Sequence, residues 1–214
     1  LGGQGTHLAA GLGRPVKERD RLSVGKDGAS ETGLYLCPGD RFGGGVVRIV
    51  PSLQTTLFSP DERHRFEATT FERDTRGNRM GVRLQQEGEG FSSEAGLSVL
   101  SEVVVPGDIQ ITGDGSPFVL LSECQTTGGY PRIGSVLPAD LPRVVQARPG
   151  ESLCFRFVSL DEATEIEKRA DESRRTLHAR LSPLVRDPST IPDLLTYQLI
   201  SGVSAGDELE GNVT

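Results

Sequence analysis

Short β-like runs separated by glycine and proline turns dominate the sequence between residues 45 and 158. Val46–Val50 is rich in β-branched residues, and Leu153, Phe155 and Phe157 alternate with polar residues, as on a strand with one buried face. Short strands at such close spacing favour a closed barrel, because closure removes exposed sheet edges. The sequence therefore predicts a mainly β barrel domain over residues 45–160.

The end of this region has the pattern of a helix. Ser159 and Glu162 are spaced as in a capping box, and an apolar stripe that includes Ala163 and Ile166 follows among alternating charges. These signals predict a helix over residues 161–183, ended by Pro183. The glycine-rich residues 1–44 are interpreted as an incomplete β segment. Residues 184–214 are expected to form a partly ordered tail whose apolar stretch, Leu194–Val203, packs on another protein.

Charge and cysteine usage exclude several classes of protein. The 214 residues carry a net charge of -7 without a run of lysines or arginines, which argues against nucleic acid or anionic membrane as a partner. No apolar stretch approaches the roughly 20 residues of a membrane-spanning helix. The 3 cysteines are widely spaced, which argues against a disulfide framework and a thiolate zinc site. We expect a cytoplasmic protein with reduced thiols and no metal site of its own.

A polar loop, Ser122–Ile133, is the first candidate for a binding site. Its sequence SECQTTGGYPRI follows an apolar run, and Gly128-Gly129 permit positive φ and close backbone approach. A ligand loop and an ordinary glycine-proline turn both remain open interpretations. The donors and acceptors of the loop come from Gln125, Thr126, Thr127, Tyr130 and Arg132.

Arginines near a second turn form another candidate. Period-two alternation places Arg83 on the opposite face from Val82 and Leu84, so that Arg79 and Arg83 could converge on an anion. Two exposed arginines beside a turn are the alternative. The sequence contains no G-x-x-x-x-G-K-[ST] motif, which excludes a P-loop.

Several separated motifs together resemble one known family. They are Asn78–Leu84 (NRMGVRL), Leu100–Glu102, Asp108–Ile111, Gln125–Pro131 (QTTGGYP), Ala139–Pro142 (ADLP), and Gln146 before Pro149-Gly150. In this order and spacing they resemble the family variously called allophanate hydrolase subunit 2, KipI antagonist (KipA) or the C subunit of 5-oxoprolinase. The resemblance runs from about Thr6 to Ala163 and corresponds to the C-terminal two thirds of the family's length.

The resemblance implies a cyclophilin-like β-barrel with a C-terminal helix. It also implies a KipI-type partner subunit, a third subunit, and a part in the ATP-dependent opening of 5-oxoproline to glutamate. One alternative is the carboxyltransferase component of a urea-carboxylase or allophanate system, which would use biotin. Another is a non-catalytic regulatory module that antagonises a kinase inhibitor. The sequence departs from the family pattern at Asn78, Asp108, Glu123 and Ser52-Leu53-Gln54, the last in place of Gly-Pro-Gln.

Opening a lactam with ATP requires cations for phosphate and a base for water. Glu102 or Asp140 could orient water or hold magnesium, and the amides Gln110 and Gln125 suit an amide or ureido substrate. We expect ATP with magnesium either at this subunit or at a partner. The predicted catalytic residues are Glu102, Asp140, Arg132 and Tyr130, and the predicted binding residues are Arg79, Arg83, Gln110, Gln125, Thr126, Thr127, Gly128 and Gly129. We expect one concave polar pocket with Glu102 or Asp140 at its rim, lined by Arg83, Gln110, Gln125, Thr127, Tyr130 and Arg132.

Three other chemistries are less well supported by the sequence. Cys124 has no histidine near it in the sequence, which favours an idle thiol over a nucleophile. His7, His64 and His178 lack the spacing of metal ligands. Prolyl isomerase activity does not follow from a barrel alone, because a fold does not carry an activity with it.

Overall fold

The computed structural model describes residues 11–26, 28, 33–37, 39, 42–96 and 98–184. The chain divides into two units, one of Tyr35–Pro183 and one of Leu1–Leu34 with Leu184–Thr214. All the predicted site residues belong to the first unit. The apolar stretch Leu194–Val203, predicted to pack on another protein, lies outside the described residues.

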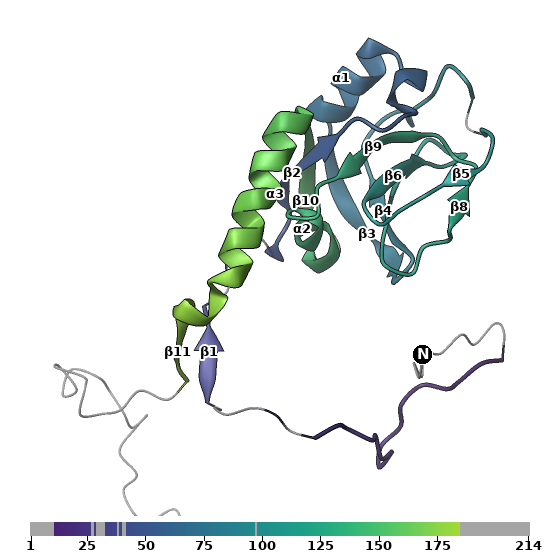
Figure 1. The fold of residues 1–214 in the computed structure, drawn as a ribbon. Helices are drawn as coiled ribbons and strands as arrows, with labels where there is room; N and C mark the ends of the chain where they lie inside the picture. Colours follow the sequence, from purple (N-terminus) through teal and green to yellow (C-terminus); the bar gives the residue numbers. More distant parts are fainter. Residues whose placement is uncertain are drawn as a thin grey trace, which may run out of the picture. The chain divides into compact units, whose positions relative to one another are not determined.

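Seven strands close into a barrel, which confirms the predicted mainly β fold (Figure 1). The β10–β2 pair is parallel and the other pairs are antiparallel. In their order around the barrel the strands are β10 (Ser152–Phe157), β2 (Gly45–Val50), β9 (Arg132–Val136), β6 (Asp108–Ile111), β7 (Pro117–Leu120), β4 (Gly81–Gln85) and β3 (Thr70–Asn78).

Two short sheets lie outside the barrel. One pairs β5 (Glu102–Val103) with β8 (Thr127–Gly128) in antiparallel fashion, and Glu102 lies opposite Gly128. The other pairs β1 (Leu34–Leu36) with β11 (Leu181–Pro183). The β5–β8 sheet belongs to the loop that the sequence indicates as a binding segment, and it brings the stretch around residue 102 to that loop.

Phenylalanines fill much of the barrel core. Helix α1 (Pro60–Ala68) begins at Ser59, whose hydroxyl accepts a hydrogen bond from the Glu62 backbone N–H at 3.1 Å. Its Phe66 is fully buried and packs against Phe71 and Phe155, with ring centroids 5.0 and 5.1 Å apart. The short helices η3 (Thr55–Leu57) and α2 (Leu141–Gln146) complete this region.

Helix α3 (Leu160–Arg175) packs along the barrel as the sequence predicts, but it is shorter than predicted (Figure 1). Ala163 and Ile166 are buried in a cluster with Leu137 and Val158. The prediction of a helix to residue 183 is wrong, because η4 (Leu177–Arg180) and β11 follow. Beyond Ile166 no α3 residue is fully buried, and helices gain most of their stability from such burial.

Candidate functional site

Predicted site residues form a row across four barrel strands. Arg83 on β4 pairs with Phe118 on β7, which pairs with Gln110 on β6, and Gln110 pairs with Arg132 on β9. Residues directly opposite one another share a face of the sheet. Strand neighbours such as Val82 and Ile109 belong to the core, so the row lies on the outer wall. Three strand spacings separate Arg83 from Arg132, roughly 14 Å.

Arg132 is the centre of a polar cluster at one end of this row. Its Nη2 donates to Glu102 Oε2 at 2.6 Å, and its Nη1 donates to Asp108 Oδ2 at 3.1 Å and to the Val103 carbonyl at 2.9 Å. The Arg132 side chain is only 10% exposed. One guanidinium therefore joins β9 to β6 and to the β5–β8 sheet.

Gln54 completes the cluster, and our interpretation of the sequence missed it. Its Oε1 accepts a hydrogen bond from the Arg132 backbone N–H at 3.0 Å, and its Nε2 donates to Glu102 Oε2 at 2.8 Å. The sequence did contain a signal for Gln54. Of the triplet Ser52-Leu53-Gln54, only Gln54 matches the family pattern Gly-Pro-Gln. We name Arg132, Glu102, Asp108 and Gln54 the Arg132 cluster.

Gln110 lies beside the Arg132 cluster, and the NH2 group of its side-chain amide is unpaired. Its side chain is 2% exposed, and its Nε2 has no hydrogen-bond partner among the described residues. The atom lies directly under Gly128, since a Cβ at that glycine would come within 2.3 Å of Nε2. A buried donor without a partner is costly, and such groups are rare in stable folds. Only a glycine leaves room for this amide.

Most of the polar side chains of the predicted loop are exposed, although Gly128 of the same loop lies against Gln110. Gln125, Thr126, Thr127 and Tyr130 are exposed. The loop is tied to the preceding segment through backbone bonds, such as Val104 N–H to the Thr126 carbonyl at 3.1 Å. The second glycine, Gly129, also lies close to other backbone, because a Cβ there would come within 3.2 Å of the Val99 carbonyl oxygen. The glycines thus permit the close packing that the sequence predicts, but neither has the positive φ that their sequence also allows.

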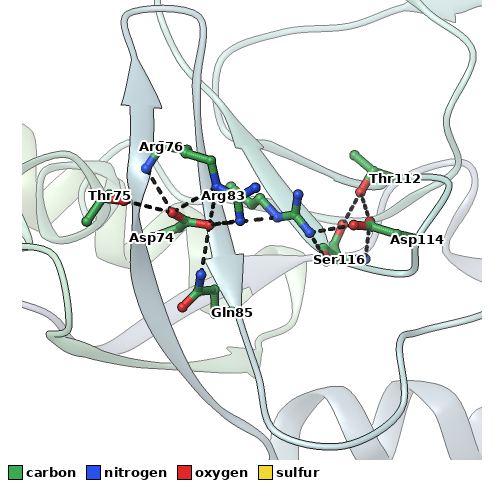
Figure 2. Close-up of polar contacts among 8 residues, drawn as sticks. All are labelled: Asp74, Thr75, Arg76, Arg83, Gln85, Thr112, Asp114 and Ser116. Atoms are coloured by element: carbon green, nitrogen blue, oxygen red, sulfur yellow. Dashed lines mark hydrogen bonds and ion pairs between the residues drawn. The ribbon is translucent and has the colours of Figure 1, made fainter.

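Arg83 belongs to a second polar group, which Figure 2 shows. Its Nη2 pairs with Asp114 and donates to Ser116 Oγ at 2.9 Å, and its Nε lies 3.9 Å from Asp74 Oδ2. The Thr112 hydroxyl is the main cause that lowers the pKa of Asp114 to about 2. Arg83 therefore lies between two carboxylates, and its role as an anion ligand stays a prediction.

Asp74 is the buried carboxylate of this second group. It is 3% exposed and accepts hydrogen bonds from Arg76 Nη2 at 2.5 Å and Gln85 Nε2 at 2.9 Å. The bonds from Arg76 hold the pKa of Asp74 well below its ordinary value. Because each polar atom of Asp74 is engaged within the protein, we interpret the group as a brace between β3, β4 and the β6–β7 turn (Figure 2).

Two further predicted residues lie apart from the Arg132 cluster. Arg79 is exposed and its Nε pairs with Glu123 Oε2 at 3.1 Å. Asp140 is buried and accepts three hydrogen bonds from Arg48, from the backbone N–H at 2.8 Å and from Nε and Nη2 at 2.6 Å each. The structure thus brings Glu102, Gln110 and Arg132 together, but places the other charged candidates in separate ion pairs instead of one pocket.

The described residues do not fit magnesium-ATP well. Every arginine predicted to bind phosphate pairs with a carboxylate, namely Arg79, Arg83 and Arg132. Among these residues, no group of three or more His, Cys, Asp or Glu side chains is arranged to hold a metal ion.

Burial raises the pKa of the Cys124 thiol, which disfavours a thiolate nucleophile. None of the described helices is long and apolar enough to cross a membrane.

Comparison with known proteins identifies relatives among 5-oxoprolinase subunits. The chain is 32% identical over 182 residues to the 5-oxoprolinase C subunit of Escherichia coli (strain K12), a match of 81% of this chain and 56% of the relative. The Haemophilus influenzae protein of the same name is 31% identical over 159 residues, which covers 73% of this chain and 50% of the relative. The chain therefore spans about half the length of these curated relatives.

Urea amidolyases show a weaker likeness. The Lachancea kluyveri protein is 28% identical over 139 residues, 61% of this chain and 8% of that protein. The crystal structure of the K. lactis urea amidolyase shares the fold, with a TM-score of 0.55 at 22% identity over 67% of this chain and 10% of that one. The family model described as carboxyltransferase domain, subdomain A and B, matches residues 1–157. The chain belongs to this carboxyltransferase-domain family, to which its motifs pointed.

Proposed function

We propose that this chain is the barrel-bearing part of a 5-oxoprolinase C subunit, which acts in the cytoplasm with a KipI-type subunit and a third subunit. The assembly would open the lactam of 5-oxoproline to glutamate in an ATP-dependent reaction. The observation that carries the proposal is the Arg132 cluster beside the unpaired amide of Gln110, in a chain similar to two 5-oxoprolinase C subunits. Because Arg79, Arg83 and Arg132 lie in separate ion pairs, and no group of three or more carboxylates among the described residues is arranged to hold magnesium, we assign the nucleotide and its magnesium to a partner subunit.

The cluster has the groups that lactam opening needs at the substrate. Transfer of the ATP γ-phosphoryl group to the lactam carbonyl oxygen, with loss of ADP, would activate the ring carbon, and attack of water would then form a C–O bond there. N–H donors would stabilise the negative charge on the oxygens at that carbon. Both hydrogen bonds to Glu102 end on its Oε2, which leaves its Oε1 unbonded among the described residues, and we assign the Glu102 carboxylate to accept a proton from water. Breakage of the ring C–N bond, with a proton delivered to the nitrogen, would then give γ-glutamyl phosphate, and a second water would release phosphate and leave glutamate.

Reconstitution tests the proposal. The protein, co-expressed with its partner subunits, should release phosphate in proportion to added 5-oxoproline. Arg132→Ala should lower this turnover at least about tenfold, and Arg132→Lys should also be impaired, because lysine lacks the guanidinium fork that reaches both Glu102 and Asp108. Tyr130→Phe should lower turnover by a similar factor if its phenol contacts the substrate.

Arg79→Ala provides the matched control, because Arg79 is an exposed arginine paired with a single glutamate. Its turnover should stay within about twofold of the wild type, since exposed ion pairs contribute little. A wild-type assembly that releases no 5-oxoproline-dependent phosphate would overturn the proposed function.

A carboxyltransferase acting on urea is the second candidate, favoured by the likeness to urea amidolyase. The same amide and guanidinium groups would then face urea, and biotin would supply the carboxyl group. Biotin-dependent carboxylation of urea by the assembly, without 5-oxoproline turnover, would select this alternative. An assembly that binds its partners but turns over neither substrate would favour the regulatory module.

A further inference from the structure

Polar contacts tie the segment that covers Gln110 to the barrel. We name residues 98–105 and 125–130, which flank the β5–β8 sheet, the strap. The strap has only two residue pairs in its sheet, and its Leu100 and Val103 are 88% and 69% exposed. Arg132 donates to the Val103 carbonyl and to Glu102, and Gln54 donates to Glu102 as well. Arg132 and Gln54 therefore fasten the strap to the barrel.

The two carboxylates on Arg132 differ in how easily another group can replace them. The Asp108 side chain is 4% exposed and also accepts a hydrogen bond from the Val105 backbone N–H at 3.0 Å. The Glu102 side chain is 45% exposed and contacts Arg132 through a single oxygen. Because Glu102 is about half exposed, water can solvate its carboxylate once it leaves Arg132, so its exchange for another carboxylate costs less than the displacement of Asp108 would. Asp108 is the fixed partner and Glu102 the exchangeable one.

Gln110 supplies a second, independent indication of a ligand. Its Nε2 is buried and unpaired among the described residues, and Gln110 lies directly opposite Arg132 in the β6–β9 ladder. A carbonyl oxygen that reached this amide would remove the cost of the unmade bond, which makes the atom a favourable contact for a ligand. The strap would have to shift outward to admit it, because Gly128 lies against Nε2.

We propose that the substrate carboxylate replaces Glu102 on Arg132, while Gln110 Nε2 donates to the carbonyl oxygen of an adjacent amide. The ligand class is a small molecule that carries a carboxylate and an amide carbonyl close together. This inference rests on the proposed function, since 5-oxoproline has both groups. It adds that Glu102 occupies the carboxylate position until substrate arrives and is then released to act on water.

Calorimetric titration of the reconstituted assembly with 5-oxoproline and with 2-pyrrolidinone tests the exchange. 2-Pyrrolidinone has the same lactam ring without the carboxylate. Glu102→Gln should bind 5-oxoproline about tenfold more tightly, because a neutral amide competes less well for a guanidinium. Binding of 2-pyrrolidinone should not change. In turnover, the same variant should show a lower KM together with a lower kcat.

Glu123→Gln is the matched control for Glu102→Gln. The Glu123 side chain is 53% exposed and pairs with one arginine, Arg79, so the two substitutions remove equivalent charges. Glu123→Gln should leave both affinities unchanged. Equal affinity of Glu102→Gln and wild type for 5-oxoproline would overturn the exchange, as would a parallel gain for 2-pyrrolidinone, which would indicate a mere loosening of the strap.

Gln110→Leu tests the second contact and separates binding from stability. Leucine removes an unpaired buried donor, so the thermal midpoint should stay the same or rise. Affinity for both lactams should fall about tenfold, because the carbonyl loses its donor. Gln146→Leu, at an exposed position on α2, should change neither affinity. A lower midpoint with unchanged affinity would show that Gln110 is structural and would overturn its assigned contact.

The two proposals fail in different ways. Turnover of 5-oxoproline by the wild type, with affinities that are insensitive to Glu102→Gln and Gln110→Leu, would overturn this inference alone. Binding that responds as predicted, without 5-oxoproline-dependent phosphate release, would overturn the proposed function and retain the recognition of a carboxylate-bearing amide.

Discussion

Replacement of Asp140 by asparagine should destabilise the protein without impairing its chemistry. Asp140 is 2% exposed and precedes α2, while Arg48 lies on β2. Its carboxylate receives three hydrogen bonds from Arg48, at 2.8, 2.6 and 2.6 Å. Asparagine keeps the size of the side chain but turns one acceptor oxygen into an NH2 donor. That NH2 group would face either Nη2 of Arg48 or the backbone N–H and Nε of Arg48, all of which are donors themselves.

The magnitude follows from the contacts that are lost. A hydrogen bond to a charged group contributes about 1.5 to 3 kcal/mol, and Asp140→Asn loses at least one and weakens the others. The Arg48 side chain is 29% exposed, so solvent recovers part of the loss. We expect the free energy of unfolding to fall by about 2 to 3 kcal/mol, or roughly 5 to 10 °C in Tm for a chain of this size.

Urea unfolding followed by circular dichroism would measure this loss. Asp171→Asn, on the solvated face of α3, is the control and should cost less than about 0.5 kcal/mol. Turnover of 5-oxoproline by Asp140→Asn at a temperature where it is folded should equal that of the wild type. A variant that folds with wild-type stability but turns over at least about tenfold more slowly would refute our interpretation and restore Asp140 as a catalytic residue.

Three further substitutions test the fold. The pKa of Asp74 is held low in the folded state. Its ion pair therefore stabilises the protein at a pH above the unfolded pKa of about 4, and this stabilisation is lost as the pH falls through the folded pKa. Asp74→Asn should therefore flatten the acid dependence of urea unfolding. Gly115→Ala should lower the free energy of unfolding by about 2 to 4 kcal/mol, because the φ of Gly115 is +76° and a Cβ there would lie 2.6 Å from Gly90 Cα. Gly113→Ala, in the same turn, is the control and should be nearly neutral, because a Cβ there meets nothing within 4 Å. Phe66→Ala should lower the free energy of unfolding by about 3 to 5 kcal/mol in the same assay, because it empties the centre of the aromatic core.

Local patterns in the sequence were sufficient to predict the barrel and the start of α3. Alternation placed Leu153 and Phe155 in the core, and Ser159 caps the helix through a hydrogen bond from the Glu162 backbone N–H at 3.1 Å. These features depend on residues close in sequence. The end of α3 was not predictable in the same way, because the apolar stripe continues to Leu177 and Leu181 although the surface that buries it ends near Ile166.

The candidate site was predicted only in part, because its geometry depends on residues distant in sequence. Ninety-two residues separate Arg48 from Asp140, and 78 separate Gln54 from Arg132. Sequence patterns can place a charged residue on the outer face of a strand, but they do not show which carboxylate lies opposite it. Arg83 was therefore interpreted as an anion ligand although Asp114 and Asp74 flank it.

The arginines of this barrel carry the same charge, but they differ in how easily a ligand could replace the carboxylates that pair with them. Asp140, beside Arg48, is almost fully buried and accepts three hydrogen bonds from it, so removing Asp140 would leave a partly buried cation without its carboxylate. Arg132 has one such partner, Asp108, and one exposed partner that binds through a single oxygen, Glu102. A ligand can displace an exposed, singly bonded carboxylate at small cost, whereas it cannot displace a buried one. The half-open pairing on Arg132 therefore places a replaceable carboxylate next to the unpaired amide of Gln110, and together these two groups suit a ligand that carries both a carboxylate and a carbonyl.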